Sequence, residues 1–228
     1  MLLTTPDTIR TLQRKLYAKA KQEPAYRFYA LYDKIGREDI LRHAWQLVRA
    51  NRGSPGIDGV SFEAIESGIG VDTFLQELAV SLKDKTYRAQ PVRRVMIPKA
   101  DGSQRPLGIP TIRDRVAQMA VKLIIEPIFE ADFCANLYGF RPKKSAHDAV
   151  DDIANALWAG YTQVIDADLS KYFDSIPRSS SPMTGALSHM LMRCSIPPST
   201  MRSATTAISL ACGMLSKYFD RSASMTWV

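Results

Sequence analysis

The sequence contains few cysteines and no long apolar run. Its three cysteines, Cys134, Cys194 and Cys212, are scattered through 228 residues and form no C-x-x-C pair. This spacing supports neither a zinc site nor a disulfide framework, and it favours reduced cytosolic thiols. No stretch approaches the ~20 apolar residues of a membrane span, and no basic segment followed by an apolar core opens the chain. We therefore expect a cytoplasmic protein with no secretory signal and no membrane partner.

The composition is that of a folded, basic protein. The chain is 46% hydrophobic and 23% charged, which is sufficient to form a core in one or two domains. Its net charge of +7 and pI of about 9.4 favour a polyanionic partner, nucleic acid above all. Basic and acidic residues are interspersed, which favours a folded, groove-lining surface over a disordered basic arm. The alternative is a mildly basic protein without such a partner.

Five segments of the sequence have the periodicity or the terminal signals of helices. They are residues 6–22, 37–51, 72–83, 112–129 and 145–158, and Ser145 is suited to cap the last of them. Glycine and proline break the chain into a tight loop at residues 51–59. Residues 92–97 and 104–109 predict two strands around a turn, and residues 164–168 predict a further strand. The sequence therefore predicts an α+β fold.

The segment VIDADLSKYFD, residues 164–174, combines an apolar run with carboxylates and an aromatic pair. A β-branched run that ends in Asp168 predicts a buried strand that delivers a carboxylate to the end of a sheet. Hard cations such as Mg²⁺ prefer oxygen ligands on rigid elements, so Asp168 is a candidate metal ligand. Asp166 shares a strand face with Asp168 and is either a second ligand or, as we favour, a capping or ion-paired residue.

Three further segments precede this motif in the chain. They read NRGSPGIDGV at 51–60, PKADGSQRPLGIP at 98–110 and YGFRPKKSAHDAV at 138–150. In this order the four segments resemble the N-terminal part of a group II intron reverse transcriptase/maturase. The resemblance implies the fingers and partial palm of a right-hand polymerase, acting as an RNA-directed DNA polymerase with a maturase role. It also implies Mg²⁺ as the cofactor and RNA template or intron RNA, DNA primer and deoxynucleoside triphosphates as partners.

The resemblance assigns roles to individual residues. Asp168 matches the catalytic metal ligand, and Phe173 matches a steric gate under the sugar, with a core aromatic as the alternative. Positions matching the grip on the incoming triphosphate are Arg93, Lys99 and Arg105. Template or nucleotide contact is implied for Tyr138, Phe140, Arg141, Lys143 and Lys144. The 51–59 loop resembles a segment involved in template handling, and its glycines would let backbone N–H groups approach a phosphate.

The geometry of the basic hairpin depends on the length of its turn. A two-residue turn would pair Arg105 with Pro98, whereas a three-residue loop ending at a left-handed Gly102 would pair Arg105 with Ile97. We predict the three-residue loop, because it places three cations on one face of the ribbon, namely Arg93, Lys99 and Arg105. The alternative is an exposed basic hairpin whose charges are only solvated.

The last part of the sequence departs from the family. Residues 179–228 are rich in Ser, Thr and Met and contain one acidic residue, Asp220. We expect an atypical, foreign or out-of-frame tail there, and a genuine divergent segment is the alternative. The expected organisation is an N-terminal helical extension at 1–35, the fingers region at 36–160, the start of the palm at 161–178 and the tail.

The second catalytic motif of the family, an aromatic residue followed by x-Asp-Asp, has no convincing match. The pair Asp151 and Asp152 lies in a predicted helix and precedes Asp168, so we reject it. We therefore expect a truncated polymerase that is inactive alone, or alternatively a non-catalytic RNA-binding module that assists splicing. His43 and His147 fall in predicted helices, where we expect packing or surface roles.

Overall fold

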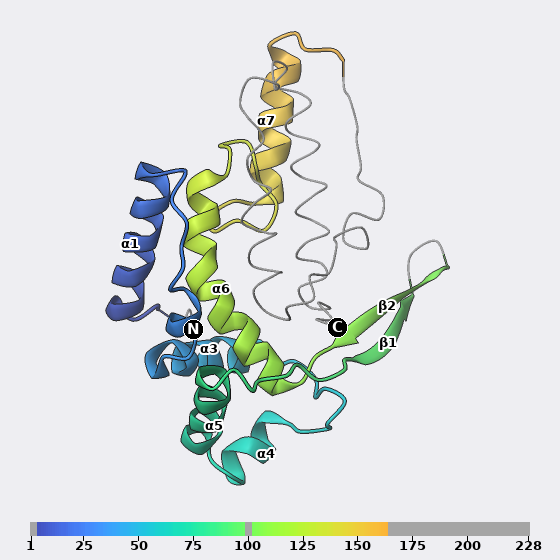
Figure 1. Cartoon of the computed structure of the whole chain (residues 1–228). Helices are drawn as coiled ribbons and strands as arrows, with labels where there is room; N and C mark the ends of the chain where they lie inside the picture. Colours follow the sequence, from blue (N-terminus) through green and yellow to red (C-terminus); the bar gives the residue numbers. More distant parts are fainter. Residues whose placement is uncertain (1–3, 99–101, 164–228) are drawn as a thin grey trace. The chain divides into compact units, whose positions relative to one another are not determined.

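The computed structural model describes residues 4–98 and 102–163, which divide into two compact units with the boundary in the chain between residues 132 and 133. The first unit holds α1 (Asp7–Gln22), α2 (Tyr32–Ile35), α3 (Glu38–Ala50), α4 (Phe62–Ser67), α5 (Val71–Lys83), β1 (Arg93–Pro98), β2 (Gln104–Ile109) and α6 (Ile112–Asp132) (Figure 1). The second holds α7 (Ala146–Trp158). Lys99, Asp168, Phe173 and the predicted tail lie outside the described residues.

The predicted helices and both hairpin strands are confirmed in the described part of the chain. Their ends are unchanged or shift by one residue, except that α6 continues three residues beyond its predicted end. The structure adds two short helices that the sequence analysis did not predict, α2 and α4. Helices of four and six residues span too few turns to show a hydrophobic period. The described fold is mixed, with helices and one two-stranded antiparallel sheet.

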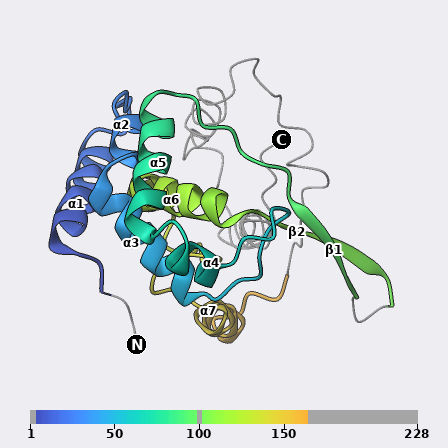
Figure 2. The ribbon, with the colours of Figure 1, turned by 90° about the horizontal axis from the view of Figure 1, so that it is seen from below.

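Helix α6 lies at the centre of the first unit and contacts α1, α2 and α3 (Figures 1 and 2). Its predicted apolar stripe is buried at Val116, Ala120 and Ile124, which are fully inaccessible. Helix α3 packs its own apolar stripe against α6 and α5, as its 3.6-residue period predicts. Burial of these stripes, at about 25 cal/mol per Å² of apolar surface, is the main force that holds the helices together.

A proline inside α6 is compensated by a side chain from α1. Pro127 has no N–H, so the carbonyl of Leu123, one turn earlier, loses its helical donor. Gln13 of α1 donates its Nε2–H to that carbonyl at 3.0 Å. Lys21 donates similarly to the carbonyl of Ala131 in the last turn of α6, at 3.0 Å. These two bonds fix α1 along α6 in addition to apolar packing.

The hairpin of β1 and β2 projects away from the helices of the first unit (Figures 1 and 2). Most of its side chains are exposed, and burial increases only toward the end of β2. An isolated two-stranded hairpin is marginally stable in water, so its root must be held by the neighbouring helices. No described helix is both long enough and apolar enough to cross a bilayer.

In the second unit, α7 begins at a capping box. Ser145 Oγ accepts a hydrogen bond from the Asp148 amide, and the Asp148 side chain accepts one from the Ser145 amide. This satisfies two N–H groups that a helix start leaves unpaired, and it confirms Ser145 as the N-cap. The pair Asp151 and Asp152 lies within this helix, as predicted. His147 is exposed on α7, whereas His43 is buried in α3 of the first unit.

Candidate nucleic-acid interface

The hairpin register is the one predicted from the three-residue loop. Ile97 pairs with Arg105, and Arg93 pairs with Ile109. Gly102 has a φ of 77°, the left-handed conformation that this loop requires. Cross-strand partners share a face and residues two apart share a face, so Arg93 and Arg105 lie on the same side of the ribbon. Lys99, the third predicted cation of this face, is outside the described residues.

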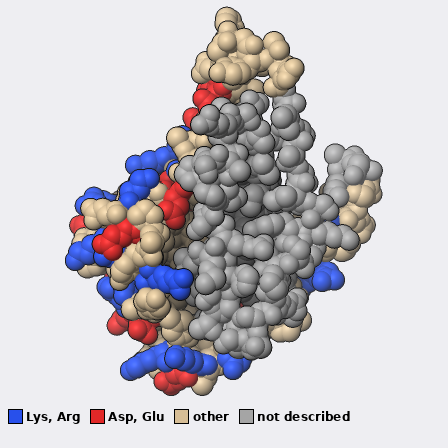
Figure 3. Space-filling model, turned by 45° about the horizontal axis from the view of Figure 1, so that its top comes forward, with Lys and Arg blue, Asp and Glu red and all other residues tan. Residues whose placement is uncertain are grey.

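Arg94 provides the contrast. It pairs with Gly108 and therefore lies on the opposite face from Arg93 and Arg105. All three arginines are exposed. On the face that Figure 3 shows, basic and acidic side chains of the described residues are interspersed. The hairpin thus presents cations by its register rather than by lying within a uniformly basic surface.

A buried carboxylate anchors the root of this hairpin. Asp114, which is 2% exposed in the first turn of α6, accepts hydrogen bonds from Tyr87 Oη at 2.5 Å and from Thr111 Oγ1 at 2.7 Å. It also accepts one from the Gln90 amide at 3.2 Å, just before β1. Burial, followed by the bond to Asp114, raises the pKa of Tyr87. This network ties the segment before β1 to α6.

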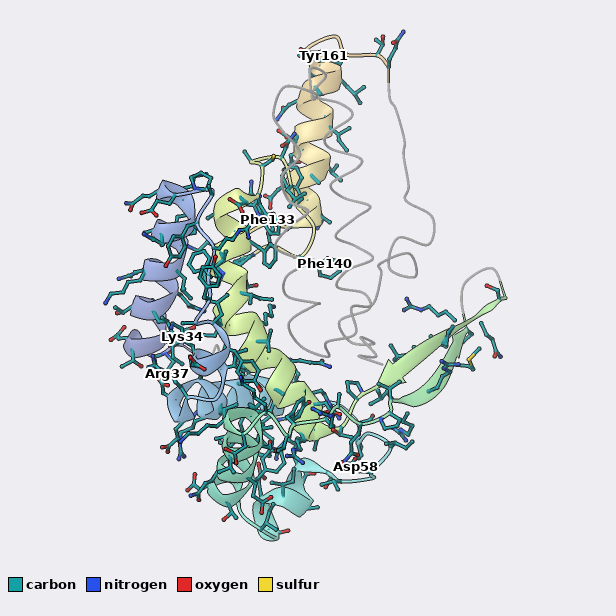
Figure 4. All side chains as sticks on the ribbon, in the orientation of Figure 1. Lys34, Arg37, Asp58, Phe133, Phe140 and Tyr161 are labelled. Carbon is teal, nitrogen blue, oxygen red and sulfur yellow. The ribbon has the colours of Figure 1, made fainter. Side chains whose placement is uncertain are left out.

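The glycine loop of residues 51–59 packs against the start of α6. A Cβ on Gly56 would lie 2.6 Å from the Thr111 Cα, so only glycine allows this approach. Arg115 of α6 reaches the loop and donates from Nη2 to the carbonyl of Ser54. Asp58 lies on the same loop, close to the hairpin root (Figure 4). Three segments that the sequence analysis treated separately, the loop, the hairpin and α6, therefore meet at one place.

An open pocket of about 340 Å³ adjoins this loop. It is lined by Arg49, Arg52, Gly53, Pro55, Ser61, Phe62 and Glu63. Arg49 is held by Glu66, with Nε 2.7 Å from Oε1, and its charge is largely neutralised. Arg52 is exposed at a φ of 48°, a conformation uncommon for residues other than glycine. Arg52 is therefore the cation of this pocket with the most freedom to meet a ligand.

In the second unit, the loop before α7 holds the remaining predicted contact residues. Tyr138 is 8% exposed and donates its hydroxyl to Asp152 at 2.5 Å, a bond that raises the pKa of Tyr138 to about 12. Lys144 Nζ lies 4.9 Å from the centre of the Tyr138 ring. Tyr138 is thus held to α7 by its hydrogen bond to Asp152, and its ring also contacts Lys144, which precedes the helix. Its expected contact with template or nucleotide stays a prediction.

Arg141 organises the same loop. Its Nη1 donates to the carbonyls of Cys134 and Leu137 at 2.6 and 2.9 Å, and its guanidinium lies 5.3 Å from the Phe133 ring centre. Phe133 and Phe140 both lie on this loop (Figure 4). The structure gives Arg141 a local role in the fold, and its predicted contact with nucleic acid stays untested.

Two residues of this loop have an unusual backbone. Phe140 and Lys143 have φ values of 57° and 62°, and both are exposed. Left-handed conformations at residues other than glycine cost free energy and concentrate at functional sites. Of the five contact residues predicted here, Phe140 and Lys143 are therefore presented outward by a strained backbone.

No group of three or more His, Cys, Asp or Glu side chains suited to a metal occurs among the residues that the structure describes. The candidate magnesium ligand, Asp168, lies outside them and stays a prediction.

The sequence analysis missed Arg115, Tyr87 and Asp114. Each lies in or beside an element predicted correctly, but none belongs to a recognised motif. Their partners are distant in sequence: Ser54 is 61 residues from Arg115, and Tyr87 is 27 residues from Asp114. The one local signal was Thr111, whose hydroxyl accepts from the Asp114 amide in an N-cap pattern.

Comparison with known proteins identifies the class. The family described as "Reverse transcriptase (RNA-dependent DNA polymerase)" matches residues 97–185, which include the end of β1 and all of β2, α6 and α7. The matched relatives show that the chain is related to the group II intron reverse transcriptase/maturases, as the four motifs predict. The resemblance stated from the sequence is thereby confirmed.

Three relatives illustrate the match. Protein YkfC of Escherichia coli K12 is 39% identical over 174 residues, which cover 74% of this chain and 45% of that protein. Group II intron-encoded protein LtrA of Lactococcus lactis subsp. cremoris is 38% identical over 157 residues, 65% of this chain and 24% of LtrA. Nuclear intron maturase 1, mitochondrial, of Arabidopsis thaliana is 34% identical over 67 residues, 29% of this chain and 9% of that protein. The chain spans less than half the length of each of these relatives.

Proposed function

We propose that this chain is the fingers and partial palm of an RNA-directed DNA polymerase of group II intron type with a maturase role. The observation that carries the proposal is the hairpin register, which places Arg93 and Arg105 on one face of the ribbon. The family relationship supports the same assignment. Intron RNA or RNA template, a DNA primer and deoxynucleoside triphosphates are the proposed partners, in the cytoplasm.

The proposed chemistry assigns each group a separate task. Arg93, Arg105 and Lys99 hold the triphosphate of the incoming nucleotide by neutralising its charge. Phe173 packs under the sugar and disfavours a 2′-hydroxyl. The carboxylate of Asp168 has the hard oxygen donors that Mg²⁺ prefers, and an ion bound there would stabilise the charge that develops during phosphoryl transfer.

We further propose that the 228-residue chain does not polymerise alone. Two metal ions need several carboxylates, and Asp168 is the one catalytic carboxylate that the motifs assign. The purified chain should therefore bind a primer–template without extending the primer when Mg²⁺ and deoxynucleotides are added. Extension of the primer would contradict this proposal.

The interface can be tested on the two faces of the hairpin. We would measure fluorescence anisotropy of an RNA template annealed to a labelled DNA primer, with a deoxynucleoside triphosphate present, across a salt series. R93Q/R105Q should weaken binding and flatten the dependence of log K on log salt, by about 0.7–0.9 for each lost phosphate contact. R94Q is the matched control for the single variants R93Q and R105Q. It should retain more affinity than either of them and more than the double variant. Equal losses for R94Q, R93Q and R105Q would refute a one-sided interface.

The second candidate function is that of a non-catalytic RNA-binding module, which assists splicing without synthesising DNA. The match to Nuclear intron maturase 1, mitochondrial, supports it. Intron RNA and an unrelated RNA of equal length, compared in the same assay, separate the two functions. Tight and selective binding of the intron RNA would favour the splicing module.

A further inference from the structure

Arg115 lies at the junction of α6 and the glycine loop, where it has an unusual environment. Its guanidinium is half-buried, donates to the Ser54 carbonyl and lies 5.8 Å from the centre of the Phe62 ring. Its buried Nε has no hydrogen-bond partner among the residues that the structure describes. Removing a cation from water in this way costs free energy, which other contacts of Arg115 must offset.

The electrostatics point the same way. Desolvation lowers the pKa of Arg115, Asp58 on the loop opposes this shift, and nearby Arg93 reinforces it. Arg115 therefore tolerates both burial and a like charge at the hairpin root. Two contacts stabilise the side chain in this position, the hydrogen bond to Ser54 and the contact with the Phe62 ring. Both attach α6 to the segment that contains the loop.

The loop is built to accept this side chain. A Cβ on Gly53 would overlap the Nη1 atom of Arg115, so glycine leaves the space that the guanidinium occupies. Gly53 itself does not adopt a left-handed φ, so its small size matters here rather than its backbone freedom. Farther along, Gly56 makes a similarly close approach to Thr111.

We propose that Arg115 is a positioning residue that holds the 53–59 loop against α6, so that the loop presents its backbone N–H groups to a phosphate of a bound strand. The identity of the strand rests on the proposed function, whereas the contact between Arg115 and the loop does not. The alternative is that Arg115 binds the phosphate directly, and that the loop only lies next to it.

Gly53→Ala separates these roles, because it displaces the guanidinium without changing any charge. We would compare G53A, R115A, R115K and G53A/R115A with R113A as a control. Arg113 also lies on α6, but its Nη2 donates to Ser81 on α5, away from the glycine loop. Tryptophan fluorescence and circular dichroism would first establish that each variant is folded.

The state of the loop is read without nucleic acid. Trypsin cleavage between Arg52 and Gly53, followed by mass spectrometry, and amide exchange at Gly59 and Val60 report its opening. Both amides are hydrogen-bonded within the loop, to Gly56 and Asp58. R115A and G53A should each accelerate cleavage and exchange by about tenfold or more, the effect expected from losing one charge-assisted hydrogen bond. R113A should leave both rates near those of the parent chain.

Binding then identifies the role. The same labelled RNA–DNA primer–template serves as the probe in a salt series. For a positioning residue, G53A and R115A should lower affinity similarly, the double variant should be no weaker than R115A, and G53A should retain the parent salt slope. R115K should restore only part of the affinity, because an ammonium cannot cover Phe62 as a planar guanidinium does.

Two results would overturn the proposal. Unchanged cleavage and exchange in G53A and R115A would show that Arg115 does not hold the loop. Parent affinity in G53A, together with a salt slope reduced by about one phosphate contact in R115A, would make Arg115 a direct ligand. If the parent chain does not bind the probe, the proposed function fails, while cleavage and exchange still decide whether Arg115 holds the loop.

Discussion

The side chain of Gln13 should be worth more to stability than its position on a surface helix suggests. It donates to the Leu123 carbonyl, which Pro127 deprives of its helical donor. Leu123 is only 6% exposed, so water cannot fully replace the lost bond. Gln13→Met keeps the length and most of the packing of the side chain but removes the donor, and therefore isolates the hydrogen bond.

The expected cost follows from the unsatisfied carbonyl. Leaving a buried acceptor without a partner costs about 1–3 kcal/mol, which corresponds to roughly 2–4 °C in Tm for each kcal/mol. Urea unfolding followed by the fluorescence of buried Trp45 measures this in the first unit, in a background with Trp158 and Trp227 replaced by Phe. Gln22→Met, on the exposed end of α1, is the matched control and should change stability by no more than ~0.5 kcal/mol.

A double-mutant cycle tests whether Gln13 compensates for the donor that Pro127 lacks. Pro127→Ala restores an N–H one turn after Leu123, so the helix can satisfy its own carbonyl. In that background Gln13→Met should cost less, with a coupling free energy of about 1 kcal/mol or more. An equal cost of Gln13→Met in both backgrounds would show that Gln13 does not compensate for the proline.

Three further predictions concern other buried or capped groups. His43→Leu should raise the free energy of unfolding by about 1 kcal/mol, because neither ring nitrogen of this buried residue has a partner among the described residues, and a lower urea midpoint would contradict this. The pKa of Tyr87 is raised in the folded state, so its contribution to the free energy of unfolding is complete below its unfolded pKa of about 10 and is lost as the pH rises above that value. Tyr87→Phe should therefore reduce the loss of stability at alkaline pH, measured by urea unfolding. An unchanged pH profile of stability would contradict this. Ser145→Ala should destabilise α7 by about 0.5–2 kcal/mol, measured as faster exchange of the Asp148 amide, and unchanged exchange would exclude the cap.

Much of the local structure could be predicted from the sequence. The apolar period placed α3 and α6, Ser145 marked the start of α7, and the left-handed Gly102 fixed the hairpin register. Each of these features depends on residues a few positions apart. The candidate hairpin face therefore followed from the sequence, although the roles of its arginines and of Asp168 remain predictions.

The sequence by itself determined the longer helices, the cap of α7, the hairpin turn and the family motifs, because near neighbours decide hydrogen bonding and side-chain periodicity. Only the tertiary structure decided which distant groups compensate for one another. Gln13 and Leu123 are 110 residues apart, and Arg115 and Ser54 are 61 apart. Such pairs form when helix packing brings their elements together, and no local pattern in the chain specifies a partner at that distance.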